Sequence, residues 1–508
     1  MSILLCQRRP ACQGSQPYGL FSEEHRMSSD RAAAVKPTIQ SLGTHYSAPQ
    51  WFRDAKFGIY MHWGVYSTVG RAEWYGRHMY IPGHEDNAHH IKTYGHPSTF
   101  GYKDLIPLWK AERFDPEAML DVIKRAGAKY FSPCAVHHDN FDLWDSRHHK
   151  WNAANMGPKQ DLIGMLKDAT IAAGLRWGVT THLARSYSWF NTNKNSDEGG
   201  PYDGNDPAYQ DYYHSPSDDQ SAWHPADPPK QWRDQWKARI CDLIDRYEPD
   251  VLYFDGAIPF RGEDEFRTGM EVMAHYYNRS IARHGKLDSV MFLKDIDEYM
   301  GAFSHGLYVN NVASLDLEQS GANRLIYRPW QTDFTVVKSG WSYNPDAELY
   351  DVDELIHLLV DVVSKYGCLL LNIPPMPSGE LEQRVVDRLA EIGSWLATNG
   401  EAIYGTRPFS VFGQGEDVRF TTKDKALNII LLNWPAGGKL TLDLKDPWRD
   451  ALPGIEGVTM LTGEQALPFT QNGAELTITL PASPPKGQEH AFVVQVHCDR
   501  NTTPDWLN

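Results

Sequence analysis

The sequence predicts an α/β protein: an irregular (β/α)8-like barrel followed by a C-terminal antiparallel β-sandwich. Up to about residue 405, short apolar runs typical of buried strands alternate with amphipathic helical segments, as in a parallel barrel. After residue 405, strands with alternating apolar residues are separated by Gly, Pro and Asp turns. We therefore predict a leader at residues 1–45, a barrel at residues 46–405 and a sandwich at residues 406–508.

The predicted leader carries no periodic apolar segment. Its apolar run at residues 3–6 is too short for the core of a signal peptide, and Met27 followed by Ser-Ser-Asp is a candidate start. We expect residues 1–45 to be poorly ordered and the protein to be cytoplasmic rather than secreted. No apolar run approaches the length of a membrane span, so no membrane association is predicted.

Composition excludes some classes of partner and favours another. The net charge of -16 argues against nucleic acid, because a phosphate-binding surface needs an excess of Lys and Arg. The 17 Trp and 25 Tyr can supply a large core, and aromatic rings also serve as platforms in carbohydrate sites. The six Cys form no CxxC pair, so neither a disulfide framework nor a zinc motif is predicted.

Four predicted barrel strands end in polar side chains. The strands at residues 57–61, 129–136, 175–181 and 251–254 are followed by His62, by His137 and His138, by His182 and by Asp255. Because the carboxyl ends of barrel strands meet at one face, we expect these side chains to lie together. A single His is usually structural, and Asp255-Gly256 is also a common turn pair. Several such residues at successive strand ends favour a functional site.

Helices are predicted between these strands. Residues 115–126 have Pro116 at the first helical position and apolar residues on one face. A helix at residues 161–173 stops at Gly174, and another at residues 230–247 leads into the strand before Asp255. The polar, aperiodic stretch at residues 191–230 is expected to be a functional loop.

The later part of the chain completes both units. A strand at residues 289–293 ends near Lys294, after which the pattern weakens around residues 307–318. Helix, strand and helix follow at residues 352–366, 368–373 and 384–398. The sandwich strands are predicted at residues 418–422, 426–432, 439–442 and 475–480.

Several blocks of the barrel resemble one enzyme family. The blocks are, in chain order, AKFGIYMHWGVYS, EWY, VHHDNFDLWDS, GPKQDLIG, YFDG, PWQTD, LLLNIPP and NGEAIYGTRP. Together they are similar to the α-L-fucosidases of glycoside hydrolase family 29, over roughly residues 50–410. The resemblance implies a catalytic (β/α) barrel with a C-terminal β-sandwich. It also implies retaining hydrolysis of terminal α-L-fucose through a covalent glycosyl-enzyme, without a cofactor or metal.

The resemblance assigns roles to individual residues. Asp255 matches the family's nucleophile, in the strand-end Asp-Gly block. The residues that would line the fucose pocket are His62, Glu73, Trp74, His137, His138 and His182. Neutral His can donate and accept hydrogen bonds, as sugar hydroxyls require. Tyr253 and Trp341 are candidates for apolar contact with the sugar ring and its methyl group. The implied partner is a fucosylated oligosaccharide or glycoconjugate, and a homo-oligomer is compatible with this interpretation.

Glu318 is the predicted general acid/base. It lies shortly before the PWQTD block, as the acid/base does in one subgroup of the family. In that subgroup Arg-Gly usually follows the Glu, whereas Gln319 and Ser320 follow it in this chain. The alternatives are Glu271, Asp297 and Glu298, each of which is also explained as a charge on a surface helix or loop.

Two other classes of function compete with a retaining glycosidase. A metal-dependent barrel hydrolase also places His at strand ends, but no HxH pair ends the first strand and no HExxH motif occurs. A non-catalytic fucose-binding protein on the same scaffold would be favoured if a catalytic carboxylate were missing, and Asp255 is present.

Overall fold

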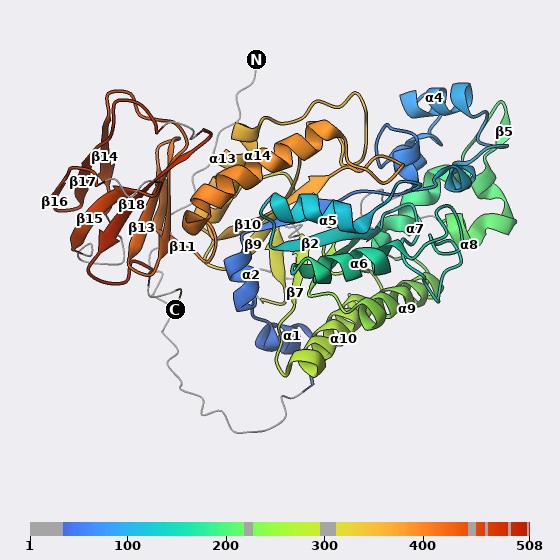
Figure 1. Ribbon diagram of the computed structural model, residues 1–508. Coiled ribbons are helices and arrows are strands. Elements are labelled where there is room, and N and C mark those ends of the chain that lie inside the picture. The colour runs from blue at the N-terminus through green and yellow to red at the C-terminus, as the bar shows by residue number, and fades with distance from the viewer. Residues whose placement is uncertain are drawn as a thin grey trace, which may run out of the picture. The chain divides into compact units, whose positions relative to one another are not determined.

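The computed structural model describes residues 34–217, 227–294, 311–445, 454–462, 466–485, 489–504 and 507, and eight parallel strands close a barrel (Figure 1). The strands follow one another around the barrel in chain order, and the last pairs with the first. They are β1 (Phe57–Met61), β2 (Tyr130–Val136), β3 (Arg176–Thr181), β6 (Val251–Phe254), β7 (Val290–Lys294), β8 (Ser314–Asp316), β9 (Trp330–Thr335) and β10 (Gly367–Ile373). The predicted α/β barrel is confirmed.

Helices cover the outside of the barrel because its strands are apolar on both faces. Every residue of β1, β2 and β10 is buried. The large helices are α5 (Pro116–Arg125), α6 (Leu162–Ala172), α9 (Lys230–Tyr247), α10 (Arg267–His284), α13 (Val352–Ser364) and α14 (Gln383–Asn399). The side chains of Asp115 and Asp161 cap α5 and α6 by accepting backbone N–H groups, which explains where these helices begin.

Shorter elements surround the barrel, and those labelled η are 3₁₀ helices. They are α1 (Ile39–His45), α2 (Gln50–Ala55), η1 (Val65–Thr68), α3 (Tyr75–His78), α4 (Glu85–Thr93), η2 (Tyr102–Leu108), η3 (Leu183–Arg185), α7 (Ser186–Trp189) and η7 (Gly400–Ala402). The described part of the predicted functional loop forms η4 (Phe190–Lys194), β4 (Ser196–Asp197), β5 (Gly200–Pro201), η5 (Asp203–Asn205), η6 (Pro207–Tyr209) and α8 (Gln210–Tyr213). Among the described helices, none is both long and apolar enough to cross a bilayer.

The predicted leader differs from the structure at its carboxyl end. Residues 1–33 lie outside the described part of the chain. Residues 39–45, however, form the helix α1, which is capped by Thr38 and buries Leu42 completely. The last part of the predicted leader is therefore folded rather than poorly ordered.

The C-terminal strands form two antiparallel sheets, as predicted. The larger sheet contains β11 (Arg407–Gln414), β12 (Val418–Lys423), β13 (Ala426–Leu431), β18 (Phe492–Cys498) and β15 (Ile455–Met460), in that order. The smaller sheet contains β14 (Lys439–Asp443), β17 (Glu475–Thr479) and β16 (Phe469–Asn472). Alternate residues such as Leu440, Leu442, Leu476 and Ile478 are buried in a core shared by both sheets.

A buried ion pair fixes the loop that follows β2 and its two His residues. Arg239 of α9 has no exposed surface, and its guanidinium group binds both carboxylate oxygens of Asp142. The same group donates to Oδ1 of Asn140 at 2.6 Å. Burial of these charges is costly, so each depends on the other for compensation.

We expect Arg239→Ala to destabilise the protein by roughly 3–5 kcal/mol, because it leaves the Asp142 carboxylate buried without its partner. Urea denaturation followed by circular dichroism measures this loss. Arg147→Ala is the matched control, because the Arg147 side chain is 69% exposed, and its effect should stay within about 0.5 kcal/mol. Equal effects of the two substitutions would contradict the assigned role of Arg239.

Candidate active site

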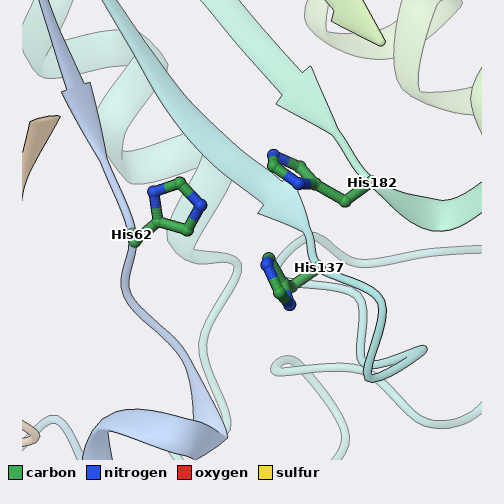
Figure 2. A group of neighbouring side chains, drawn as sticks. All are labelled: His62, His137 and His182. Atoms are coloured by element: carbon green, nitrogen blue, oxygen red, sulfur yellow. The ribbon is translucent and has the colours of Figure 1, made fainter. Parts of the chain in front are cut away.

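Three His rings converge at the carboxyl ends of β1, β2 and β3. Figure 2 shows His62, His137 and His182 pointing toward a common space from three neighbouring strands. The ring centroids of His62 and His182 lie 5.3 Å apart, and those of His137 and His182 lie 4.8 Å apart. The ring nitrogens of all three lie within 4.8 Å of one another, so this group could also hold a metal ion.

Burial and the neighbouring His side chains keep two of these rings neutral. Burial lowers the pKa values of His62 and His137 well below the ordinary range, and the neighbouring His side chains lower them further. Oδ1 of Asn372 lies 2.9 Å from Nδ1 of His62 and accepts a hydrogen bond from the Nδ1–H group, which leaves Nε2 as an acceptor. Nδ1 of His137 is buried and has no partner among the described residues. The pocket therefore offers a hydrogen-bonding position to a ligand.

His138 and His182 border the carboxylate of Asp255. His182 places Nδ1 3.2 Å from Oδ2 of Asp255, and its Nε2 lies 2.7 Å from the hydroxyl of Tyr60. His138 donates from Nδ1 to the carbonyl of His182 and places Nε2 3.4 Å from the same oxygen of Asp255. Burial lowers the pKa of His138 well below its ordinary range, and the charge of Arg185 acts in the same direction.

Aromatic rings and a carboxylate complete the pocket wall. Glu73 is buried, and its Oε2 accepts the backbone N–H groups of Trp341 and Ser342. The half-buried ring of Trp341 lies 5.4 Å from that of His62, and the ring of Trp74 lies 5.5 Å from that of His138. The structure therefore brings together all six residues expected to line the pocket, and Trp341 with them.

Asp255 follows β6 and is surrounded by cations. Its side chain is 7% exposed, with Nζ of Lys294 at 2.5 Å and a guanidinium nitrogen of Arg185 at 3.7 Å. Burial raises the pKa of Asp255, but the charges of Lys294 and Arg185 together lower it well below the ordinary range. The carboxylate is therefore ionised at neutral pH, as a nucleophile must be.

Lys294, the last residue of β7, joins Asp255 to Glu318. Its Nζ lies 2.5 Å from Oδ1 of Asp255 and 2.7 Å from Oε2 of Glu318. Because both contacts share the Nζ atom, Oδ1 of Asp255 and Oε2 of Glu318 lie at most about 5.2 Å apart. Glu318 is 42% exposed, so it borders the pocket on the side open to solvent.

A second pair of carboxyl groups lies beneath this site. Asp316 of β8 and Asp333 of β9 are each 2% exposed, and the hydroxyl of Tyr253 lies 3.3 Å from an oxygen of each. Gln331 donates to Asp316 at 2.7 Å. Burial raises the pKa of Asp316 to about 6, and burial and the charge of Asp316 raise that of Asp333 well above its ordinary range. The charge of Asp255 raises the pKa of Lys294 against the effect of its burial, and the nearby carboxyl groups of Asp333, Glu318 and Asp316 act in the same direction.

Tyr253 occupies a different place from the one predicted. It has no exposed surface, and its hydroxyl group faces the carboxyl groups of Asp316 and Asp333. Because side chains alternate along a strand, Tyr253 points into the barrel one layer below Asp255. Tyr253 thus lies beneath the pocket floor, where it has no surface to offer to a sugar ring.

The structure describes only one of the three alternatives to Glu318 as the general acid/base. Glu271 lies on α10, where its carboxylate contacts Nζ of Lys237 at 2.5 Å, in the helical layer outside the barrel. Asp297 and Glu298 lie outside the described residues. Among the described candidates, Glu318 is the one that shares a cation with Asp255.

Sequence reasoning missed four residues of the site: Lys294, Arg185, Asp316 and Asp333. The sequence could have indicated Lys294, because this residue directly follows the predicted strand at residues 289–293, as His62 and His182 follow theirs. Arg185 lies four residues beyond the end of β3, in η3. Asp316 and Asp333 lie in strands whose polar inner residues conceal the usual apolar run.

These features define a class of protein. A (β/α) barrel with two carboxyl groups close together at the carboxyl ends of its strands, beside clustered His and Trp side chains, is the arrangement of a glycoside hydrolase.

Comparison with known proteins identifies the family. A family profile described as alpha-L-fucosidase matches residues 22–401, and one described as alpha-L-fucosidase C-terminal domain matches residues 414–497. Tissue alpha-L-fucosidase of Rattus norvegicus is 30% identical over 449 residues, covering 86% of this chain and 87% of the relative. Plasma alpha-L-fucosidase of Homo sapiens is 30% identical over 426 residues, covering 81% of each chain.

A solved structure agrees with these relatives. The crystal structure of Thermotoga maritima alpha-fucosidase in complex with fucose has a TM-score of 0.71 and 29% identity, and the match covers 91% of this chain and 99% of that one. The chain therefore belongs to the α-L-fucosidase family, glycoside hydrolase family 29, and is an α-L-fucoside hydrolase.

The contact between Lys294 and Asp255 predicts a pH effect. Lys294→Met removes a charge that lowers the pKa of Asp255, so that pKa should rise. A nucleophilic role for Asp255, which is proposed below, requires its ionised form, so the acidic limb of kcat/KM should move to higher pH, by roughly 1–3 units. Lys237→Met removes an equal charge from the helical layer and should leave the limb in place. An unshifted limb in Lys294→Met would contradict this role.

Asp316 predicts a pH-dependent stability. Its pKa of about 6 in the folded protein exceeds the roughly 3.9 of an unfolded Asp. Its contribution to stability is thus fully present below about pH 3.9 and is lost as pH rises through about 6. Asn cannot ionise, so Asp316→Asn should gain stability relative to wild type over this range, by roughly 1–3 kcal/mol.

Urea denaturation at about pH 4.5 and pH 7 measures this gain. Asp346→Asn replaces an exposed carboxylate and should show the same small difference from wild type at both pH values. A gain for Asp316→Asn that is independent of pH would refute the linkage.

Proposed function

We propose that this enzyme removes terminal α-L-fucosyl residues from fucosylated oligosaccharides or glycoconjugates with retention of configuration. Asp255 is the nucleophile and Glu318 the general acid/base. The observation that carries the proposal is the common contact of both groups with Lys294, which keeps their nearest oxygens within about 5.2 Å. Retaining glycosidases separate the two carboxyl groups by about 5–5.5 Å, whereas inverting ones need about 6.5–9.5 Å to admit a water molecule.

In the first step, Oδ2 or Oδ1 of Asp255 attacks the anomeric carbon of fucose and forms a glycosyl-enzyme ester. Glu318 donates a proton to the departing glycosidic oxygen. In the second step, Glu318 accepts a proton from water, which attacks the same carbon and releases fucose. The exposure of Glu318 suits this role, because the leaving group and the incoming water both pass on the solvent side.

Lys294 must release Glu318 for the first step. The ammonium contact is one that an ionised carboxylate makes, whereas a general acid must carry a proton. We infer that substrate binding separates these two groups while Lys294 keeps its contact with Asp255. The half-exposed Glu318 is the mobile partner, because Lys294 is 15% exposed and held by the carboxyl groups beneath it.

The pocket residues recognise the sugar. His62, Glu73, His137, His138 and His182 supply buried donors and acceptors for hydroxyl groups. Trp74 and Trp341 supply apolar ring surface for the pyranose and its methyl group. The similarity to a structure solved with fucose supports this assignment.

Two substitutions should fail differently. Asp255→Gly should lose nearly all activity on every fucoside, because no glycosyl-enzyme can form. Glu318→Ala should lose about 10²–10⁴-fold on natural substrates but much less in the first step on aryl fucosides, whose leaving groups need little protonation. Azide should rescue Glu318→Ala and yield fucosyl azide of retained configuration, which is checked by steady-state kinetics and NMR of the product.

Two controls complete this experiment. Glu271→Ala should behave as wild type, because Glu271 lies outside the barrel. Wild-type enzyme treated with a chelator should keep its activity, since loss would favour the metal-dependent alternative that the three converging His rings allow. Near-normal hydrolysis of natural substrates by Glu318→Ala would show that another group is the acid.

A further inference from the structure

A second cluster of His and carboxylate side chains lies outside the fucose pocket. His78 ends α3, His84 is the N-cap residue of α4, and Asp86 lies in the first turn of α4. The rings of His78 and His84 are stacked with their centroids 4.3 Å apart. None of the three residues takes part in the proposed hydrolysis.

The donor atoms of this cluster are arranged like the ligands of a tetrahedral cation. Oδ2 of Asp86 lies 3.3 Å from Nδ1 of His78 and 3.7 Å from Nδ1 of His84. All three atoms lie within 4.8 Å of one another. Tetrahedral Zn²⁺ with bonds of about 2.0–2.1 Å to His and Asp has neighbouring ligand atoms roughly 3.3 Å apart. A small contraction of the cluster therefore gives three ligands in position.

The hydrogen bonds around the cluster indicate which atoms would have to bind a cation. Nδ1 of His84 accepts the backbone N–H of Asp86 at 3.1 Å, so its proton is on Nε2, and a cation would take the Nδ1 lone pair in place of this hydrogen bond. Nε of Arg71 binds Oδ1 of Asp86, which leaves Oδ2 turned toward the two rings. An outer partner that orients a ligating carboxylate in this way is characteristic of protein metal sites.

The accessibility of the cluster suits an open coordination site. The side chains of His78 and His84 are 31% and 30% exposed, whereas that of Asp86 is 7% exposed. A cation can reach the donors from solvent, and water can occupy the fourth position. Two imidazoles and one carboxylate suit Zn²⁺ better than Ca²⁺ or Mg²⁺, which prefer oxygen ligands alone.

We propose that His78, His84 and Asp86 form a Zn²⁺ site that braces one wall of the fucose pocket. Helix α3 begins directly after Trp74, and the ring of Trp74 contacts both His78, at 6.0 Å, and His138, at 5.5 Å. A cation would join the end of α3 to the start of α4 and restrict the Glu73–Trp74 segment between Arg71 and α3. The binding site itself does not depend on which residues perform catalysis.

Zn²⁺ titration by isothermal calorimetry tests the site, and the variants separate it from the His rings of the pocket. Wild type should bind Zn²⁺ and gain thermal stability from it. His84→Ala should weaken this binding by more than the roughly 10- to 100-fold that loss of an outer partner costs, and should lose the thermal shift. His137→Ala, which disables the pocket trio, should retain both, as should the matched control His89→Ala on the same helix α4.

Cobalt substitution gives a second readout. Co²⁺ should produce the visible bands of a tetrahedral site in wild type and His137→Ala, but not in His84→Ala. His84→Ala should keep basal fucosidase activity in metal-free buffer, so failure of the metal site is distinguishable from failure of the proposed mechanism. The proposal is overturned if wild type shows no saturable Zn²⁺ binding, or if His137→Ala abolishes the binding while His84→Ala retains it.

Discussion

The ammonium group of Lys294 is the charge on which the catalytic end of the barrel depends. It contacts Asp255 and Glu318 directly, and Asp316 and Asp333 lie close enough to raise its pKa. Four carboxyl groups so near one another, three of them buried, would repel strongly and force proton uptake without a cation among them. Lys294 lets Asp255 stay ionised, and the charge of Asp255 in turn raises the pKa of Lys294. The ionisation of Asp255 and the protonation of Lys294 thus depend on each other.

Burial gives the pocket its chemical character. A fully exposed His would often be charged near pH 6. Burial lowers the pKa values of His62, His137 and His138, and neighbouring His and Arg side chains lower them further. A neutral imidazole ring can both donate and accept hydrogen bonds, so these rings can match hydroxyl groups by direction as well as by proximity. Asn372 illustrates how this is achieved, because its amide oxygen fixes the proton of His62 on Nδ1.

The barrel strands were predictable where both faces are apolar, as in β1 and β10. Strands β8 and β9 escaped prediction because their inner faces carry Asp316, Gln331 and Asp333. These polar residues lie close to Lys294. The rule that a buried barrel strand is a run of apolar residues therefore fails at the strands next to the site. In the sandwich, β14 and β17 show the predicted alternation of buried residues. Strands β12 and β13 lie where they were predicted but are buried at several consecutive positions, and β16 has no fully buried residue.

Linear pattern was sufficient to place His62, His137, His138, His182 and Asp255 at one end of the barrel, since strand direction dictates which ends meet. It could not reveal the contact between Asp255, Lys294 and Glu318. That contact depends on register: Phe254 is level with Leu293, and Lys294 is level with Asp316. Register is set by pairing between strands far apart in the chain and by packing of the whole barrel, and neither is encoded in the spacing of nearby residues. The proximity of His78 to Asp86 likewise arises only when α3 and α4 pack together.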